Sequence, residues 1–151
     1  MSPFIPTKEK EQVSKILANM DREVHVTVLT QPTSTLTIPG TSLHSYKETL
    51  ELATEVATLT SKIKLNVIDV IAHPEKLAEH RMTEPPAIVL SRNRQVNNLR
   101  FFGAPTGYEF SSFIQSLLLF SGSSPDLPKE FSQEVQELAS PLHLEVFVTP
   151  T

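Results

Sequence analysis

One short run of the sequence, Ser42-Leu43-His44-Ser45, contains residue types that could carry out nucleophilic chemistry. A catalytic serine needs a histidine as base, a third group that orients this base, and hydrogen-bond donors for an oxyanion. No acidic partner is indicated for His44, and the chain has no Gly-x-Ser-x-Gly sequence. We therefore expect Ser42 to cap the helix that follows it, and we expect no catalytic residue in this chain.

The chain contains no cysteine, which excludes disulfides, thiolate metal ligands and cysteine nucleophiles within it. The histidines are the remaining candidate metal ligands, and no two of them have the i, i+4 spacing of a helical metal site. They are His25, His44, His73, His80 and His143. We expect them to be surface or partly packed side chains, and we expect neither a metal site nor a cofactor.

The glycine-containing segment 103–107, Gly-Ala-Pro-Thr-Gly, superficially resembles a phosphate-binding loop. It lacks the Lys-Ser/Thr pair of such loops, and it follows the last expected strand rather than the first. Ordinary turn formation explains it. Arg92, Arg94 and Arg100 are close together in the sequence, but we expect them on a hairpin, where charged side chains usually face solvent.

The length and charge of the chain narrow its class. A chain of 151 residues predicts one domain by default, and such a domain buries roughly 68–70% of its unfolded surface. The net charge is −4 without an evident basic patch, which argues against nucleic acid and anionic membranes as partners. No apolar run approaches the roughly 20 residues that a membrane helix needs, and no signal peptide is evident. We expect a cytoplasmic protein.

The spacing of apolar residues predicts the helices and strands. Positions three and four apart indicate helices, and alternation indicates strands. Helices are expected at 8–20, 43–61 and 74–81, after Gly107 up to Phe120, and at 128–139; strands are expected at 23–30, 62–70, 87–90, 99–102 and 142–148. A long helical connection between the first two strands implies a parallel pair, and the hairpin at 87–102 adds an antiparallel pair. The predicted fold class is α/β, with a mixed four-stranded sheet flanked by helices.

The stretch 84–120 has the most distinctive order of elements: a double proline, two strands joined by a turn, a glycine turn, and a helix. Its run 100–110, Arg-Phe-Phe-Gly-Ala-Pro-Thr-Gly-Tyr-Glu-Phe, resembles the N-terminal unit of proteins that carry two thioredoxin folds in tandem. These are the protein disulfide oxidoreductases, or glutaredoxin-like domain proteins, and the N-terminal domain of the alkyl hydroperoxide reductase flavoprotein subunit. The resemblance extends weakly over nearly the whole chain and implies a thioredoxin-like fold.

The resemblance also identifies two candidate positions. It implies that Pro86 is the cis-proline of the fold, beside the substrate groove of its relatives. The residue before that proline pairs its backbone with substrate in the family, but here it is Pro85, which has no N–H. The resemblance further places the lost Cys-x-x-Cys motif near loop 31–42, where Ser42, His44 and Ser45 are the degenerate counterpart. Serine cannot perform thiol–disulfide exchange.

The C-terminal part of the sequence repeats the beginning. Residues 142–151 align with residues 24–33, and the apolar residues of the preceding helices align at the same offset. We therefore expect a thioredoxin-like unit at 1–120, a linker at 121–127, and the first helix and strand of a second, incomplete unit at 128–151. In the resembled family a Cys-x-x-Cys would follow residue 151, so we expect that the chain stops there because of the boundary chosen for expression, proteolysis or a truncated gene.

These observations lead to a functional hypothesis with one alternative. The hypothesis is a redox-inactive unit with a scaffold or docking role in a thiol–disulfide oxidoreductase or peroxide-reduction system involved in redox homeostasis, whose chemistry lies beyond residue 151. No activity is expected from this chain alone. The alternative is a stand-alone module that binds a protein or small ligand at 31–46. An exposed strand recruits other strands, so we further expect strand 142–148 to pair with the main sheet, with a symmetry-related copy or by exchange between two chains, the last two giving a homodimer.

Overall fold

The computed structural model describes residues 4–31, 43–92, 99–124 and 128–140, together with residues 142, 143 and 145. The helices are α1 (Thr7–Leu17), α2 (Leu43–Ala57), α3 (Glu75–Glu79), α4 (Tyr108–Ser121) and α5 (Lys129–Gln136). The strands are β1 (Val24–Thr30), β2 (Ile63–Asp69), β3 (Ala87–Ser91) and β4 (Leu99–Phe102). Every helix and strand predicted before residue 140 is therefore present.

The strands form one four-stranded sheet in the order β2-β1-β3-β4. β1 and β2 are parallel, with Val26 opposite Leu65, whereas β3 is antiparallel to both β1 and β4. This arrangement follows from the connections, because α2 provides the crossover that a parallel pair requires. The α/β fold class and the mixed four-stranded sheet are confirmed.

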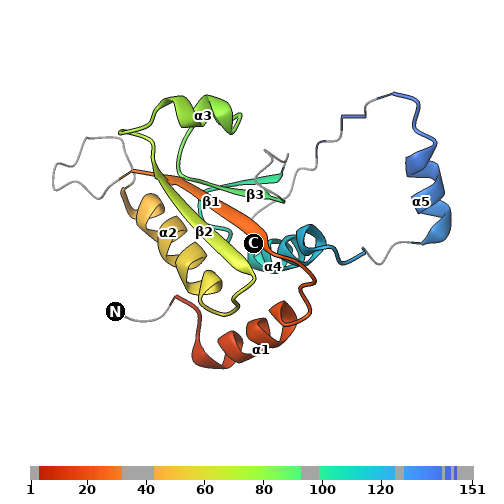
Figure 1. Cartoon of the computed structure of the whole chain (residues 1–151), viewed down its shortest axis with the longest axis horizontal. Helices are drawn as coiled ribbons and strands as arrows, with labels where there is room; N and C mark the ends of the chain where they lie inside the picture. The colour runs from red at the N-terminus through yellow and green to blue at the C-terminus, as the bar shows by residue number, and fades with distance from the viewer. Residues whose placement is uncertain are drawn as a thin grey trace.

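Two hydrophobic layers cover the sheet, one on each face (Figure 1). The larger layer joins α1, α2 and α4 to the inward side chains of β1 and β3, and its centre includes Leu17, Val26, Leu90 and Phe113. The smaller layer lies under α3 and contains Leu29, Val70, Met82, Ala87 and Val89. The alternating valines of β1 supply one layer while Leu29 supplies the other, which is the consequence of the period of two in a strand.

Two helices end earlier than the sequence pattern predicts. α1 ends at Leu17 rather than near residue 20, because the amides of Asn19 and Met20 bond to carbonyls three residues back. Met20 is nonetheless buried, so its place in the apolar stripe reflects packing beyond the helix end. α2 ends at Ala57 in the same manner, since the amide of Leu59 bonds to Val56.

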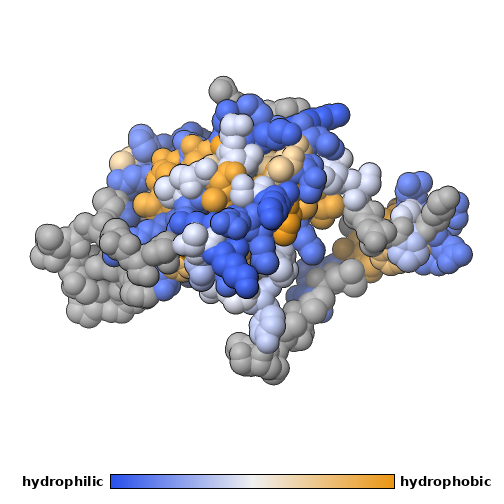
Figure 2. Space-filling view, turned by 90° about the horizontal axis from the view of Figure 1, so that it is seen from below, coloured by the Kyte–Doolittle hydropathy of each residue, from blue (hydrophilic) through white to orange (hydrophobic). Residues whose placement is uncertain are grey.

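Helix α5 lies apart from the sheet and carries exposed apolar side chains (Figure 1; Figure 2, at the right of the view). Phe131 and Val135 of α5, and Leu138 just after its end, are each about half exposed. The strand predicted at 142–148 falls largely outside the described residues, and no strand is assigned at 142, 143 or 145. Within the described ranges, no helix combines the length and hydrophobicity needed to cross a membrane.

Candidate functional site

Three segments distant in the sequence meet at one end of the sheet: the start of α2, the turn before β3, and the end of β4. The Gly103 amide donates a hydrogen bond to the Pro86 carbonyl over 2.9 Å. A Cβ atom placed on Gly103 would lie 3.8 Å from Ser45 Oγ, so this hydroxyl borders the same place. We refer to Ser45, Tyr46, Pro85, Pro86 and Gly103 as the proline-turn site.

The backbone of the proline-turn site is fixed by local geometry. The Pro85–Pro86 peptide bond is cis, as the resemblance implied, and both prolines are half-buried. Gly103 has a φ of +79°, a conformation that favours glycine. On α2, the buried Thr49 hydroxyl donates a 2.7 Å hydrogen bond to the Ser45 carbonyl.

Tyr46, on α2, lies near the turn that contains Glu84 and the two prolines. Its side chain is buried, with 8% exposure. Burial raises the pKa of the Tyr46 hydroxyl, and the negative charge of Glu84 raises this pKa further. Tyr46 therefore stays neutral at physiological pH. No signal in the sequence indicated that Tyr46 lies near Glu84, because this proximity depends on the fold.

The chemistry available at the proline-turn site is limited by its residue types. No thiol is present anywhere in the chain, so the thiolate attack of disulfide exchange cannot occur there. Pro85 offers a carbonyl but no amide to an extended peptide. The site can therefore make contacts and accept hydrogen bonds, but it lacks a nucleophile of the kind that the resembled family uses.

Only part of the predicted degenerate motif can be placed. Ser42 lies outside the described residues, and of His44 the structure describes the backbone, within the first turn of α2. Ser45 is half-buried and borders Gly103. Of the degenerate positions, Ser45 is thus the one that the described structure brings next to the Pro85–Pro86 turn.

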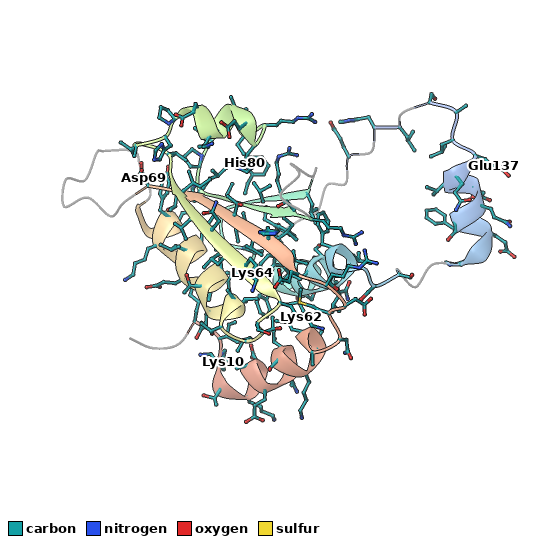
Figure 3. The ribbon with its side chains drawn as sticks, in the orientation of Figure 1. Lys10, Lys62, Lys64, Asp69, His80 and Glu137 are labelled. Atoms are coloured by element: carbon teal, nitrogen blue, oxygen red, sulfur yellow. The ribbon has the colours of Figure 1, made fainter. Side chains whose placement is uncertain are left out.

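Two cavities flank edge strand β2. The sequence suggested a binding segment at 31–46, whose residues Gln31 and Tyr46 line one of them, but it did not indicate that β2 takes part. The α2-side cavity, of about 550 Å³, is lined by residues of β1, α2 and β2 that include Gln31, Tyr46, Leu50, Val67 and Asp69. The α3-side cavity, of about 520 Å³, is lined by Asn66, Val67, Asp69, His73, Lys76 and His80, among others. Figure 3 shows Asp69 at the end of β2 and His80 beneath α3. No sequence motif marks these cavities, because they form between elements.

The described histidines do not assemble a metal site. His73 lies 3.5 Å from Glu75, and His143 lies 2.9 Å from Glu145. Nδ1 of His80 is buried and has no hydrogen-bond partner among the described residues, and burial lowers the pKa of this histidine. In the part of the chain that the structure describes, no group of three or more potential ligand side chains could hold a metal ion.

Comparison with solved structures identifies the type of α/β fold. The alkylhydroperoxide reductase AhpF of Enterococcus faecalis superposes with a TM-score of 0.72 and 22% identity, over 91% of this chain and 62% of that one. A protein disulfide oxidoreductase from Aeropyrum pernix superposes with a TM-score of 0.69 and 18% identity, over 88% of this chain and 55% of that one. The fold is thioredoxin-like.

Sequence comparison points to the same relatives, although no family model matches the chain. The alkyl hydroperoxide reductase AhpF of Staphylococcus aureus (strain Mu50) is 25% identical over 105 residues, and that of Staphylococcus epidermidis is 26% identical over 104 residues. These matches cover 70% and 69% of this chain, but only 18% of the length of either relative. This chain is thus homologous to the N-terminal region of the alkyl hydroperoxide reductase AhpF.

Proposed function

We propose that this chain is a redox-inactive thioredoxin-fold unit with a scaffold or docking role in a thiol–disulfide oxidoreductase or peroxide-reduction system. The observation that carries the proposal is a thioredoxin-like sheet and proline turn in a chain without any cysteine. A fold of this type keeps its shape without the thiols, so its contribution is a surface. We propose a cytoplasmic location for the chain, because the thiols of such a system are kept reduced in the cytoplasm.

A second unit is part of this proposal. The apolar face of α5 repeats the pattern of α1, and Phe131 corresponds to Val13, which α1 buries. Phe131 is 49% exposed, as expected for a helix whose own sheet would be supplied by further residues. We propose that residues 128–151 begin this second unit, that residues 121–127 are the linker, and that a Cys-x-x-Cys follows residue 151.

The test of this proposal is to read the gene downstream of codon 151 and to express the longer chain. A Cys-x-x-Cys within a few codons, with insulin reduction by the longer chain and none by the 151-residue chain, is the expected result. A longer chain that lacks cysteines would contradict the role in thiol chemistry. Insulin reduction by the 151-residue chain would contradict the redox-inactive role.

The alternative function is a binding module that uses the segment 31–46. The observation that favours it is the α2-side cavity, which Gln31 and Tyr46 border beside the proline-turn site. Titration of the isotope-labelled chain with a cell extract, followed by amide chemical shifts, separates the two functions. Shifts clustered on Gln31, Ser45 and Tyr46 favour the binding module, whereas a flat response counts against it.

Association through residues 142–148 is proposed as well. Leu142 is 63% exposed, and apolar residues recur at every second position from 142 to 148, as they do in a strand. Such a strand is stable only when another strand satisfies its backbone. Pairing with the main sheet of the same chain, pairing with a symmetry-related copy, or exchange between two chains in a homodimer would each satisfy it without another protein.

A further inference from the structure

A third cavity lies where the N-terminal segment meets α1, α2 and the start of α4. Its volume is about 290 Å³, and the residues that line it are Phe4, Ile5, Glu9, Leu52, Thr106, Gly107 and Phe110. All of them belong to the part of the chain that the structure describes. The cavity shares no lining residue with the two cavities beside β2, and we refer to it as the N-terminal cavity.

The apolar lining of the N-terminal cavity is held in place by the core. Ile5 and Leu52 are buried, with 3% and 1% exposure. The Ile5 amide donates a 2.9 Å hydrogen bond to the Glu55 carboxylate, which fixes the N-terminal segment against α2. Phe4 and Phe110 pack against the same hydrophobic layer, but each is only half-buried. The apolar part of this cavity is therefore already formed, as in most ligand sites.

A glycine leaves the rim of the cavity open. Gly107 has a φ of +57°, which favours glycine, and it directly precedes the first residue of α4. A Cβ atom placed on Gly107 would meet no described atom within 4 Å, so open space adjoins this lining residue. Thr106 and Glu9, which also line the cavity, are exposed. Solvent and small molecules therefore have access to the cavity at this rim.

The charged and aromatic groups of the lining favour a positive charge. Glu9 supplies a carboxylate, and none of the residues that line the cavity is lysine, arginine or histidine. Lys10, the next residue along α1, pairs with Glu55 instead. The faces of the Phe4 and Phe110 rings carry partial negative charge, which attracts cations. Aromatic rings and a carboxylate around an apolar floor are a combination suited to organic ammonium ions.

We propose that the N-terminal cavity binds a small organic ammonium ion, namely an amine with an aromatic or branched aliphatic body. The body lies on Ile5 and Leu52, and the ammonium group reaches Glu9 at the rim. The volume restricts the ligand to a small molecule, because it is at the lower end of the range for ligand sites. A carboxylate of the same size is disfavoured, since Glu9 repels it and no lining cation compensates. This proposal does not depend on the redox role or on the second unit.

The first test is a titration of the isotope-labelled full chain with 2-phenylethylamine, which is an ammonium ion at neutral pH, followed by amide chemical shifts. We expect saturable shifts at the amides of Ile5, Leu52, Gly107 and Phe110. The expected dissociation constant is about 0.1–1 mM, an ordinary value for so small a ligand. The matched compounds are 2-phenylethanol, which has the same shape without the charge, and phenylacetate, which reverses it. We expect the alcohol to bind more weakly than the amine, and phenylacetate more weakly still.

An amine that shows no saturable binding, or that shifts only residues away from the N-terminal cavity, would overturn the proposal. Equal affinities for the amine and phenylacetate would overturn it too, because the cavity would then recognise only the apolar body.

The second test removes the carboxylate. Glu9→Gln is expected to raise the dissociation constant of the amine about threefold, as for an exposed ion pair, and to leave that of 2-phenylethanol unchanged. Glu11→Gln is the matched control, because Glu11 is also exposed on α1 but does not line the cavity. If Glu9→Gln left the affinity for the amine unchanged, or if both variants weakened it equally, recognition by Glu9 would be refuted and the proposal with it.

The third test removes an aromatic ring while keeping an apolar side chain. Phe110→Leu is expected to raise the dissociation constant of the amine about two- to fivefold. Phe131→Leu is the control, because Phe131 lies on α5 and does not line the cavity. The amide spectrum of each variant without ligand shows whether it is folded, and Phe4→Leu replaces Phe110→Leu if the latter is not. Wild-type affinity in a folded variant at either position would contradict recognition by the rings and overturn the proposal.

Discussion

The Glu55 carboxylate links the N-terminal segment to α2 through polar contacts. It accepts a 2.9 Å hydrogen bond from the Ile5 amide and forms an ion pair with Lys10. Burial alone would raise the pKa of the Glu55 carboxyl, but the hydrogen bonds from Lys10 and Ile5 outweigh burial and lower it. Both of these hydrogen bonds favour the charged carboxylate, so this contact belongs to the ionised form.

Glu55→Gln is therefore expected to lower the free energy of unfolding by about 1–2 kcal/mol at neutral pH. The lowered pKa means that the stabilisation is complete above the unfolded-state pKa of about 4.3 and is lost as the pH falls through the folded-state pKa. Urea unfolding over this acidic range measures the effect, and the difference between wild type and variant should shrink. Glu51→Gln is the matched control, because its pair with Lys47 is exposed at 3.8 Å. An equal loss from both variants would contradict this role of Glu55.

His80 is also expected to make stability depend on pH, in this case closer to neutrality. Burial is the main cause that lowers the pKa of His80; nearby Lys76 and Arg100 lower it further, and Glu79 opposes them. The unfolded chain then binds the proton at a higher pH than the folded chain. Stability is complete above the unfolded-state pKa of about 6.5 and falls as the pH drops below it.

The check compares urea unfolding of wild type, His80→Gln and His73→Gln at about pH 7.5 and about pH 5.5, on either side of that unfolded-state value. The wild type and His73→Gln should lose stability on acidification, since His73 is exposed, and His80→Gln should lose less. If His80→Gln retained the full acid sensitivity, burial of this histidine would not be its cause.

At the scale of elements, α4 is held to the sheet by an aromatic pair. Phe113 is 1% exposed and meets Phe101 of β4 edge to face, with ring centroids 5.3 Å apart. Phe113→Ala removes this contact and leaves a cavity, so we expect a loss of about 3–5 kcal/mol. Tyr108→Ala on the same helix is the control, because Tyr108 is 83% exposed, and it should change stability by less than about 0.5 kcal/mol. Chemical denaturation measures both, and comparable losses would contradict this placement of α4.

Element types could be predicted from the sequence because each buried face has a clear period. The valines of β1 alternate and are buried, and Phe113, Ile114 and Leu117 of α4, at spacings of one and three, are buried as well. Helix ends were harder to predict, since Met20 continues the apolar pattern of α1 from a turn. An apolar residue in the pattern indicates that its side chain is buried, but it does not indicate whether its backbone is helical.

The sequence predicted only those features of the candidate site that depend directly on residue type. Pro85-Pro86 marked the turn, and the absent cysteines marked the missing nucleophile. The burial of Tyr46 against the charge of Glu84, and the two cavities beside β2, arise from segments that are far apart in the chain. No periodicity encodes such contacts, so they required the structure.

At the scale of the whole molecule, the chain combines a thioredoxin-like sheet with residue types that cannot exchange disulfides. Ser42 and Ser45 have the spacing of a Cys-x-x-Cys, and Ser45 borders Gly103 beside the prolines. A cysteine near a helix start is more readily ionised than a free one, because the helix dipole favours the thiolate. Ser42→Cys/Ser45→Cys is therefore expected to gain thiol–disulfide exchange, and Ser45→Cys alone is the control that cannot close a disulfide.

The most direct measurement is the rate of insulin reduction by dithiothreitol in the presence of the wild-type chain, the double-cysteine variant or the single-cysteine control. We predict that the wild type and the control stay at the background rate while the double variant exceeds it, since the shape is present and only the thiols are missing. Turnover by the wild type would contradict the redox-inactive role outright. A double variant that folds but stays at background would show that residues 42–45 do not occupy the place of a thioredoxin active site.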